Sequence, residues 1–442
     1  MTEHSFAFAL ALFVLSTAVV ILQTWNRASC GLGCSYLFQL WMLYAAGACL
    51  HALPWSELPN SDTVFTGFLV SAYGTAAFGA GWCFGPALRR NFQPQGIHSS
   101  PNVALWYVSC GMISFFVLQP LLKGVPSINS VAIAAGQLML AGLCLGAFLA
   151  YKRNGWRSIC RWLAPALVLP LVTVLKQGFL GYGVIALSAV TLFCATFVRP
   201  RWIVVAALLI GGYCGLSVFV AYMQTRNEIR AAVWTGADLR TRLSGVSLAL
   251  SRVKPFDFFD QNDLLIFDGR MDQSYLAGLA VDRLSSTGEY VHGETLTVAA
   301  VALIPRIFWP GKPFTGGSGN LVSRFTGLTF SSGTSVGIGP VMELYANYGI
   351  VCVLTGFFVL GLLLSYIDHH AAVCLQGGDS HRFVLWFLVG ISFLQASGSF
   401  VEVISTGGAS IVAAQLVNAL LSARTRIGVV KTQPDAQRVQ IA

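Results

Sequence analysis

Apolar runs of about twenty residues recur along the chain, and one long polar segment interrupts them. A helix of about 18 or more apolar residues can cross a bilayer core, so each run predicts a transmembrane helix. Eleven spans are expected, at residues 6–23, 35–53, 63–83, 103–122, 131–150, 162–175, 180–198, 202–222, 341–366, 382–400 and 404–421. The pattern therefore predicts an all-α, polytopic transmembrane helical bundle.

The polar interruption, residues 223–340, divides the chain into three parts. Residues 1–222 are expected to hold about eight spans, and residues 341–442 about three spans and a tail. Amphipathic stretches inside the interruption predict short helices on or near the membrane surface. The stretch from Glu294 to Phe314 is too short before Pro305 to span, which favours an interfacial or re-entrant helix broken by proline. We expect one long external loop that carries such helices.

Basic residues set the expected orientation. Arginines and lysines gather in alternate short loops and in the C-terminal tail, and these parts belong on the cytoplasmic side. The N-terminus and the long polar segment then lie on the opposite side. The first apolar run lacks a basic leader and a convincing cleavage site, so it is interpreted as the first span.

Composition agrees with a membrane protein and limits the partners. The chain is 55% hydrophobic and only 10% charged, far below the average of about 25% for soluble proteins. The cytoplasmic loops account for most of the net charge of +9, so no nucleic-acid partner is expected. None of the eleven cysteines lies in the long segment. This excludes a disulfide-stapled ectodomain and a thiolate metal site there, and we expect no metal or cofactor.

The positive-inside effect does not explain the cations of the external segment. They are Arg270, Arg283, His292, Arg306, Lys312 and Arg324. An arginine fork and a lysine held at headgroup depth suit the diphosphate of a lipid-linked substrate. For each arginine, a surface ion pair is the alternative, with Asp272 and Asp282 as partners, and the Arg306 region also suits a plain interfacial anchor.

Two further residues stand at the ends of predicted spans. Glu343 enters an otherwise apolar helix, where a carboxylate is costly unless it is paired. An arginine of the loop is its expected partner, in either a functional or a purely structural pair. Lys176 lies at the outer end of a short, proline-containing span and either snorkels to the interface or points to the same anion as the loop.

At these residues the chain resembles the Wzy-type O-antigen and exopolysaccharide repeat-unit polymerases, and more distantly the O-antigen ligases. The matching features are PRIFWPGKP (Pro305–Pro313), ELYANYG (Glu343–Gly349), the loop arginines and the charged hairpin at Lys176. The resemblance covers roughly residues 160–370. It departs from the family at the hairpin, where Lys176 follows Leu175 instead of an arginine following a hydroxyl residue.

The resemblance implies polymerisation of undecaprenyl-diphosphate-linked oligosaccharide units at the periplasmic face of the bacterial inner membrane. It implies no cofactor, contact with membrane lipid, and a chain-length regulator protein as a partner to be sought. The expected roles fall into two groups, catalytic (Glu343, Arg270, Arg306 and His292) and substrate-binding (Arg283, Lys312, Lys176, Arg324 and Tyr345). Glu343 and His292 are the candidates for the base that the acceptor hydroxyl needs.

Two other functions stay open. A ligase would transfer a finished glycan with nearly the same site, and only its product distinguishes it from a polymerase. A polysaccharide or lipid transporter would show internal repeats and broken or charged spans near the midplane. No convincing repeat joins the two halves of the chain, and the charges collect in the external segment, which disfavours transport.

Overall fold

A computed structural model describes residues 3–88, 101–199, 201–304, 309, 311, 317–330 and 336–432. All regular secondary structure in these residues is helical, in agreement with the all-α prediction. The α-helices are α1 Glu3–Asn26, α2 Leu32–Leu40, α3 Ala46–His51, α4 Ser61–Phe84, α5 Pro101–Ile113, α6 Gln119–Leu121, α7 Pro126–Gly136, α8 Leu138–Asn154, α9 Cys160–Gln177, α10 Gly181–Ala195, α11 Arg201–Trp234, α12 Leu239–Ser251, α13 Gln261–Met271, α14 Gln273–Thr287, α15 Glu294–Ala302, α16 Ser318–Thr326, α17 Gly339–Gln376, α18 Ser380–Ser392 and α19 Phe400–Thr432. Short π-helical turns link α2 to α3 and α5 to α6.

Eight helical stretches of the described residues are long and apolar enough to cross a membrane. They are Ser5–Asn26, Leu32–His51, Ser61–Phe84, Asn102–Leu121, Ser127–Asn154, Arg201–Trp234, Gly339–Gln376 and Phe400–Leu421. All eleven expected spans fall on helices, but those at α9, α10 and α18 do not reach this standard of length and apolarity. The chain is thus a helical, multi-pass membrane protein in its coarse features.

The surface of α11 has the character of a lipid-facing helix. Its large apolar side chains Trp202, Ile203, Leu209 and Ile210 are exposed, although the helix is among the most apolar of the chain. Contiguous exposed apolar surface of this kind is disfavoured in water and stable against acyl chains. The helix continues beyond its apolar part and ends at Trp234. Its polar last turns, from residue 223, are the first part of the long interruption.

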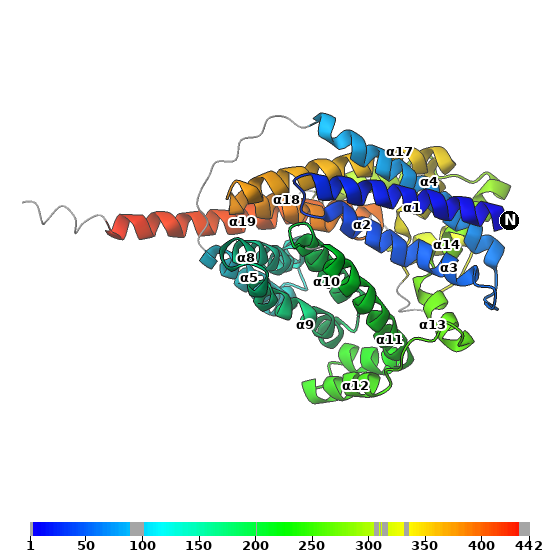
Figure 1. Ribbon diagram of the computed structural model, residues 1–442, viewed down its shortest axis with the longest axis horizontal. Coiled ribbons are helices and arrows are strands. Elements are labelled where there is room, and N and C mark those ends of the chain that lie inside the picture. Colours follow the sequence, from blue (N-terminus) through cyan, green and yellow to red (C-terminus); the bar gives the residue numbers. More distant parts are fainter. Residues whose placement is uncertain are drawn as a thin grey trace, which may run out of the picture.

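Two groups of helices make up the bundle (Figure 1). In one, α4 packs against α1, α14 and α17, and α17 packs on α18. In the other, α8 packs on α5 and α10, α9 on α10, and α11 on α12. These contacts bring the long interruption back to the spans, because α14 belongs to the first group and α12 to the second.

The helix α14 of the long interruption packs closely on the apolar helices. The helix lies against α4 and α17 and contributes Ala277 and Ala280 to the core. Glycines allow this close approach: a Cβ at Gly67 of α4 would overlap the backbone of Ser274, and one at Gly278 would overlap the carbonyl oxygen of Thr63. Small residues that let two backbones touch are typical of helix packing in membranes.

Polar residues define the ends of the helices in the interruption. Asp238, Asp260 and Asp272 cap the N-termini of α12, α13 and α14 by accepting hydrogen bonds from backbone N–H groups of the first turn. Gly288, in the left-handed conformation, ends α14. The caps at Asp260 and Asp272 fix where α13 begins and where α14 begins, and so they orient the side chains at the junction of the two helices.

Candidate functional site

A break in α17 organises the site. Tyr348 (φ −146°, ψ 32°) and Gly349 (φ 63°, ψ −150°) depart from helical geometry within the helix. The carbonyl groups of Ala346 and Asn347 accept hydrogen bonds instead from the backbone N–H groups of Val291 (2.9 Å) and His292 (3.2 Å). The segment between α14 and α15 therefore supplies hydrogen-bond donors to the carbonyl groups that the break leaves without a helical partner. Broken helices inside membrane proteins are tolerated mainly where protein or a water-filled cavity surrounds them.

An open cleft of about 490 Å³ lies beside this break. It is lined by Arg283, Leu284, Glu289, Tyr290, Val291, His292, Glu294, Arg324 and Phe325. Its volume falls in the range of about 300–1,000 Å³ that is usual for small-molecule sites. Two lining residues of the cleft contact aromatic rings of α17. The ring centroids of Tyr290 and Tyr345 are 6.1 Å apart, and those of His292 and Tyr348 are 5.8 Å apart.

The two arginines of the cleft have different surroundings. Arg324 makes a bidentate ion pair with Glu294, with both N–O distances 2.9 Å. Hydrogen bonding to Arg324 lowers the pKa of Glu294 below its ordinary value. The exposed side chain of Arg283 extends along Gly327. Among the described residues, the ion pair of the cleft involves Arg324 and not Arg283.

Glu343 lies behind the cleft on α17 and is fully buried. Its Oε2 atom accepts a hydrogen bond from the backbone N–H of Phe400 at 2.8 Å, while Oε1 has no hydrogen-bond partner. Asn347, one turn later, donates to the hydroxyl of Thr295 at 2.7 Å. Among the described residues, the partner of Glu343 is therefore the start of α19, not a loop arginine. The positive end of a helix dipole favours a carboxylate there.

The same start of α19 carries its own capping box. The backbone N–H of Glu402 donates to Ser399 Oγ at 3.3 Å, and Glu402 Oε2 accepts from the backbone N–H of Ser399 at 3.1 Å. Glu402 also accepts a hydrogen bond from Ser318 at 3.1 Å. Ser318, Ser399 and Glu402 thus join α16 to α19 next to Glu343.

Three guanidinium groups form an arginine cluster, which consists of Arg226 and Arg230 on α11 and Arg270 on α13. Each lies within electrostatic range of the others. Burial lowers the pKa of Arg270 below its ordinary value, and the charge of Arg230 lowers it further. The Nε atom of Arg226 is buried and has no hydrogen-bond partner. Arg230 is buried and the other two are partly buried, and like charges in such a place repel one another, so an anion would stabilise this arrangement.

Arg230 is the best anchored member of the cluster. Its Nε atom donates to the carbonyl of Gly178 at 3.2 Å, and its guanidinium lies 4.3 Å from the ring centroid of Phe179. The hydroxyl of Tyr222 donates to the same carbonyl at 2.7 Å. Gly178 ends α9, so Arg230 also stabilises a helix C-terminus. These contacts fix one guanidinium of the cluster in place.

The sequence-predicted residues divide between several places. Arg283, His292 and Arg324 line the cleft, and Tyr345 and Glu343 lie behind it. Arg270 belongs to the arginine cluster, whereas Lys176 lies 3.5 Å over the ring of Phe115 and donates to Gln119 at 3.3 Å. Arg306 and Lys312 lie outside the described residues.

The cleft and the arginine cluster are at opposite ends of α14. Arg270 precedes the helix, and Arg283 lies in its third turn. Arg270 therefore belongs to the arginine cluster and Arg283 to the cleft, at different places along α14.

Several residues of these regions were missed or undervalued in the sequence. Arg226 and Arg230 are not among the residues that the sequence singles out, although their spacing of four residues places them on one helix face. Glu289, Tyr290 and Glu294 carried no sequence signal for a cleft. They reach it through the pairing of Val291 and His292 with the break in α17.

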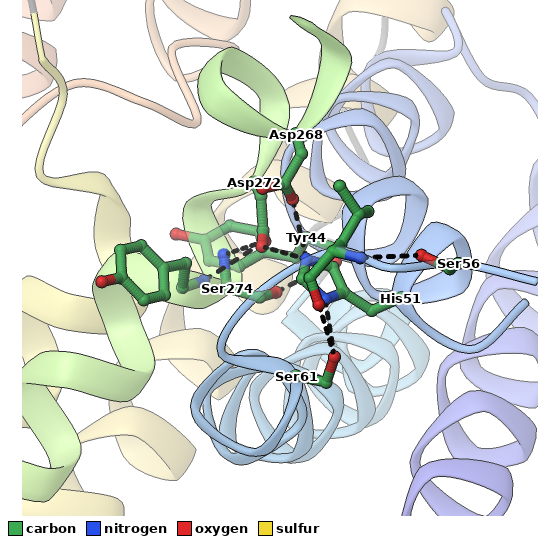
Figure 2. A network of polar contacts seen from close by, with 9 residues as sticks. Tyr44, His51, Ser56, Ser61, Asp268, Asp272 and Ser274 are labelled. Carbon is green, nitrogen blue, oxygen red and sulfur yellow. Dashed lines mark hydrogen bonds and ion pairs between the residues drawn. The ribbon is translucent and has the colours of Figure 1, made fainter. Parts of the chain in front are cut away.

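A third polar group lies where α3, α13 and α14 meet, and His51, Asp268 and Asp272 form it (Figure 2). Nε2 of His51 lies 2.8 Å from Asp268 Oδ1 and 3.7 Å from Asp272 Oδ2. Burial, together with the charge of Asp268, raises the pKa of Asp272 to about 8. The expected ion pairing of Asp272 with a loop arginine is replaced here by His51. No sequence pattern singled out His51.

Comparison with known proteins gives one match. A family model described as a domain of unknown function (DUF8712) matches residues 93–394, which is more than half of the chain. The matched region includes the arginine cluster, the cleft and the break in α17. No curated protein and no solved structure matches the chain.

Proposed function

We propose that this chain, which belongs to the DUF8712 family, is a membrane-bound glycosyltransferase that polymerises oligosaccharide units carried on a lipid diphosphate. The arginine cluster is the observation that carries the proposal. Arg226 and Arg230 lie at the polar end of the long apolar helix α11, with Arg270 of α13 within electrostatic range, and a carrier lipid would present its diphosphate at such a place. Planar guanidinium groups bind such an anion with paired hydrogen bonds and need no metal for it.

In this reaction a hydroxyl oxygen of the acceptor sugar attacks the anomeric carbon of the donor sugar. The bond between that carbon and the diphosphate oxygen breaks, and the electron pair leaves with the diphosphate. Guanidinium groups aimed at the leaving oxygen stabilise the negative charge that develops there. The proton of the acceptor hydroxyl passes to a base, and each cycle lengthens the glycan by one unit.

The cleft is the proposed place for the glycan. It is polar and open, and its lining residues Tyr290, Phe325, Arg283 and Arg324 offer aromatic faces and hydrogen-bond donors for a sugar and its hydroxyls. His292 is exposed in the cleft and is the accessible candidate for the base. Glu343 is buried behind it, so we assign it a positioning role at the start of α19.

Two separate cationic regions favour polymerisation over transfer to an unrelated acceptor. Both substrates of a polymerase carry a diphosphate, and the oligosaccharide of the acceptor separates its reacting hydroxyl from its own diphosphate. Such an enzyme needs two anion sites with a glycan path between them. The arginine cluster, with Arg270 just before α14, and Arg283, about 15 Å along α14 from its first residue, are our candidates for these two sites. We place the reaction at the periplasmic face of a bacterial inner membrane.

Binding of undecaprenyl diphosphate tests the cluster directly. The purified chain in nanodiscs is titrated with this lipid, and Arg226→Gln and Arg270→Gln are compared with Arg252→Gln. Arg252 is an exposed arginine at the end of α12 and serves as the matched control. A lost charge-assisted hydrogen bond is worth about 1.5–3 kcal/mol, so affinity should fall at least about tenfold in the cluster variants only. Equal affinity in all four proteins would contradict the proposal.

Glycan analysis in a host that lacks the native gene tests the reaction. Complementation with the natural chain should restore a ladder of repeat lengths, while Arg226→Gln and Arg270→Gln should not, at equal protein levels. A single product length would indicate a ligase. Full ladders from both cluster variants would exclude the cluster as the donor site.

A further inference from the structure

The group formed by His51, Asp268 and Asp272 has the composition of a metal site. It brings together one imidazole nitrogen and two carboxylate oxygens from three helices, all within 4.8 Å of one another. The side chain of His51 is fully buried, and that of Asp272 is 1% exposed. A tetrahedral ion with bonds of about 2.0–2.1 Å separates its donor atoms by roughly 3.3 Å. The distances of 2.8 and 3.7 Å from His51 Nε2 lie on either side of this value.

The hydrogen bonds of His51 determine which of its nitrogens faces the carboxylates as an acceptor. Ser61 Oγ donates to the carbonyl of Leu58 at 3.3 Å and lies 3.0 Å from His51 Nδ1. Because the hydroxyl proton is used, Nδ1 must donate to Ser61. In the neutral imidazole the lone pair then belongs to Nε2, which faces Asp268 and Asp272 (Figure 2). Three acceptors in contact repel one another unless a proton or a metal cation lies between them.

Asp272 supplies a second, independent observation. Its Oδ1 atom accepts hydrogen bonds from the backbone N–H groups of Ser274 (2.9 Å) and Tyr275 (3.2 Å) and so caps α14. Its Oδ2 atom is buried, points to His51 and has no hydrogen-bond partner. A buried carboxylate oxygen without a partner is costly, and a bound cation removes this cost.

We propose that His51, Asp268 and Asp272 bind one divalent transition-metal cation, Mn²⁺ or Zn²⁺. Imidazole suits Zn²⁺, carboxylates suit Mn²⁺, and the two carboxylates neutralise the charge of either ion. The hydrogen bond from Nδ1 to Ser61 is the outer contact that orients a metal-bound histidine. The ion would tie the end of α3 to the junction of α13 and α14, and thereby hold that junction, which carries Arg270, in a fixed place. This role is separate from glycosyl transfer.

Metal titration of the purified, tag-free chain tests the proposal. Mn²⁺ is the first probe because the eleven free cysteines also attract Zn²⁺. After removal of metal with a chelator, the natural chain should bind one Mn²⁺ saturably, as measured by calorimetry and by elemental analysis. Zn²⁺ should compete for the same site.

Conservative variants keep the test independent of folding. Asp272→Asn retains the oxygen that caps α14, since asparagine is as good a cap as aspartate, but it removes the free carboxylate oxygen. Asp272→Asn and Asp268→Asn should weaken Mn²⁺ binding at least about tenfold, while Asp282→Asn, an exposed acid of the same helix α14, should not. Arg226→Gln should bind Mn²⁺ normally, which separates this site from the lipid site. Absence of saturable binding, or equal affinity in Asp272→Asn, would overturn the proposal and leave a histidinium between two carboxyl groups.

Discussion

The Oε2 atom of Glu343 accepts a hydrogen bond from the backbone N–H of Phe400 at 2.8 Å, which joins the first turns of α17 and α19. The carboxylate lies at the positive end of α19 and has no exposed surface. An acceptor sugar cannot reach it in this conformation. Its position therefore indicates a role in holding the two helices together.

Glu343→Gln should preserve most of the glycan ladder, since the amide oxygen can still accept from Phe400. Glu343→Ala should destabilise the protein by about 2–4 kcal/mol, because it leaves a buried N–H unpaired and a cavity beside it. Thermal unfolding in detergent and glycan analysis at equal expression measure the two effects. A ladder lost in the folded Gln variant would restore Glu343 as the catalytic base.

Gly278→Ala should disrupt the packing of α14 on α4. The added methyl group would overlap the carbonyl oxygen of Thr63, and backbone atoms on both sides prevent an easy adjustment. We expect a loss of stability of about 1–3 kcal/mol or more, with weaker binding at both ends of α14. Gly269→Ala is the control, because a Cβ there has no neighbour within 4 Å and alanine favours the helix. Similar melting temperatures in the two variants would argue against the close contact.

The Glu294–Arg324 pair gives a pH-dependent prediction at the cleft. The pair lowers the pKa of Glu294 in the folded state. Its contribution to the free energy of unfolding is therefore complete at pH values above the unfolded-state pKa of about 4.3, and it is lost as the pH falls through the folded-state pKa. The side chains are 53% and 49% exposed, so the gain is only about 0.2–1 kcal/mol. Glu294→Gln should therefore melt slightly below the natural chain at pH 7, and the difference should vanish at pH below the folded-state pKa. A difference that persists in acid would assign the effect to packing.

The sequence was sufficient for the helices because apolar runs are local and long, but only eight of the eleven expected spans fall on helices long and apolar enough to cross a membrane. Every expected span falls on a helix, including the weak ones at α9, α10 and α18. Helix caps at Asp260 and Asp272 are likewise local signals. The packing of α14 on α4 was not predictable, since it depends on Gly67 and Gly278, two residues separated by most of the N-terminal half.

The site was predicted in part. The cations of the long segment were recognised from charge and topology, and three of the chosen residues do meet in the cleft. Their division between two regions depends on the length of α14 and could not be seen in a charge pattern. The environment of Glu343 depends on Phe400, 57 residues later, and His51 meets Asp268 across 217 residues. Contacts of this range leave no periodicity in a single sequence.

Gly349→Ala should close or deform the cleft through the backbone. Gly349 has φ 63° and ψ −150°, a conformation that is essentially restricted to glycine, while the nearest atoms to an added Cβ belong to Tyr290 at 3.6 Å and do not clash. The cost is therefore conformational, about 1–3 kcal/mol. Relief of this strain would straighten α17 and withdraw the carbonyl groups of Ala346 and Asn347 from Val291 and His292.

Hydrogen exchange measures this prediction at the two amides concerned. In the natural chain, the N–H groups of Val291 and His292 are hydrogen-bonded and should exchange slowly for a surface link. In Gly349→Ala they should exchange faster, and glycan synthesis should fall with them, while Gly269→Ala leaves both unchanged. Unaltered exchange at Val291 and His292 in a folded Gly349→Ala protein would show that the break in α17 does not depend on glycine.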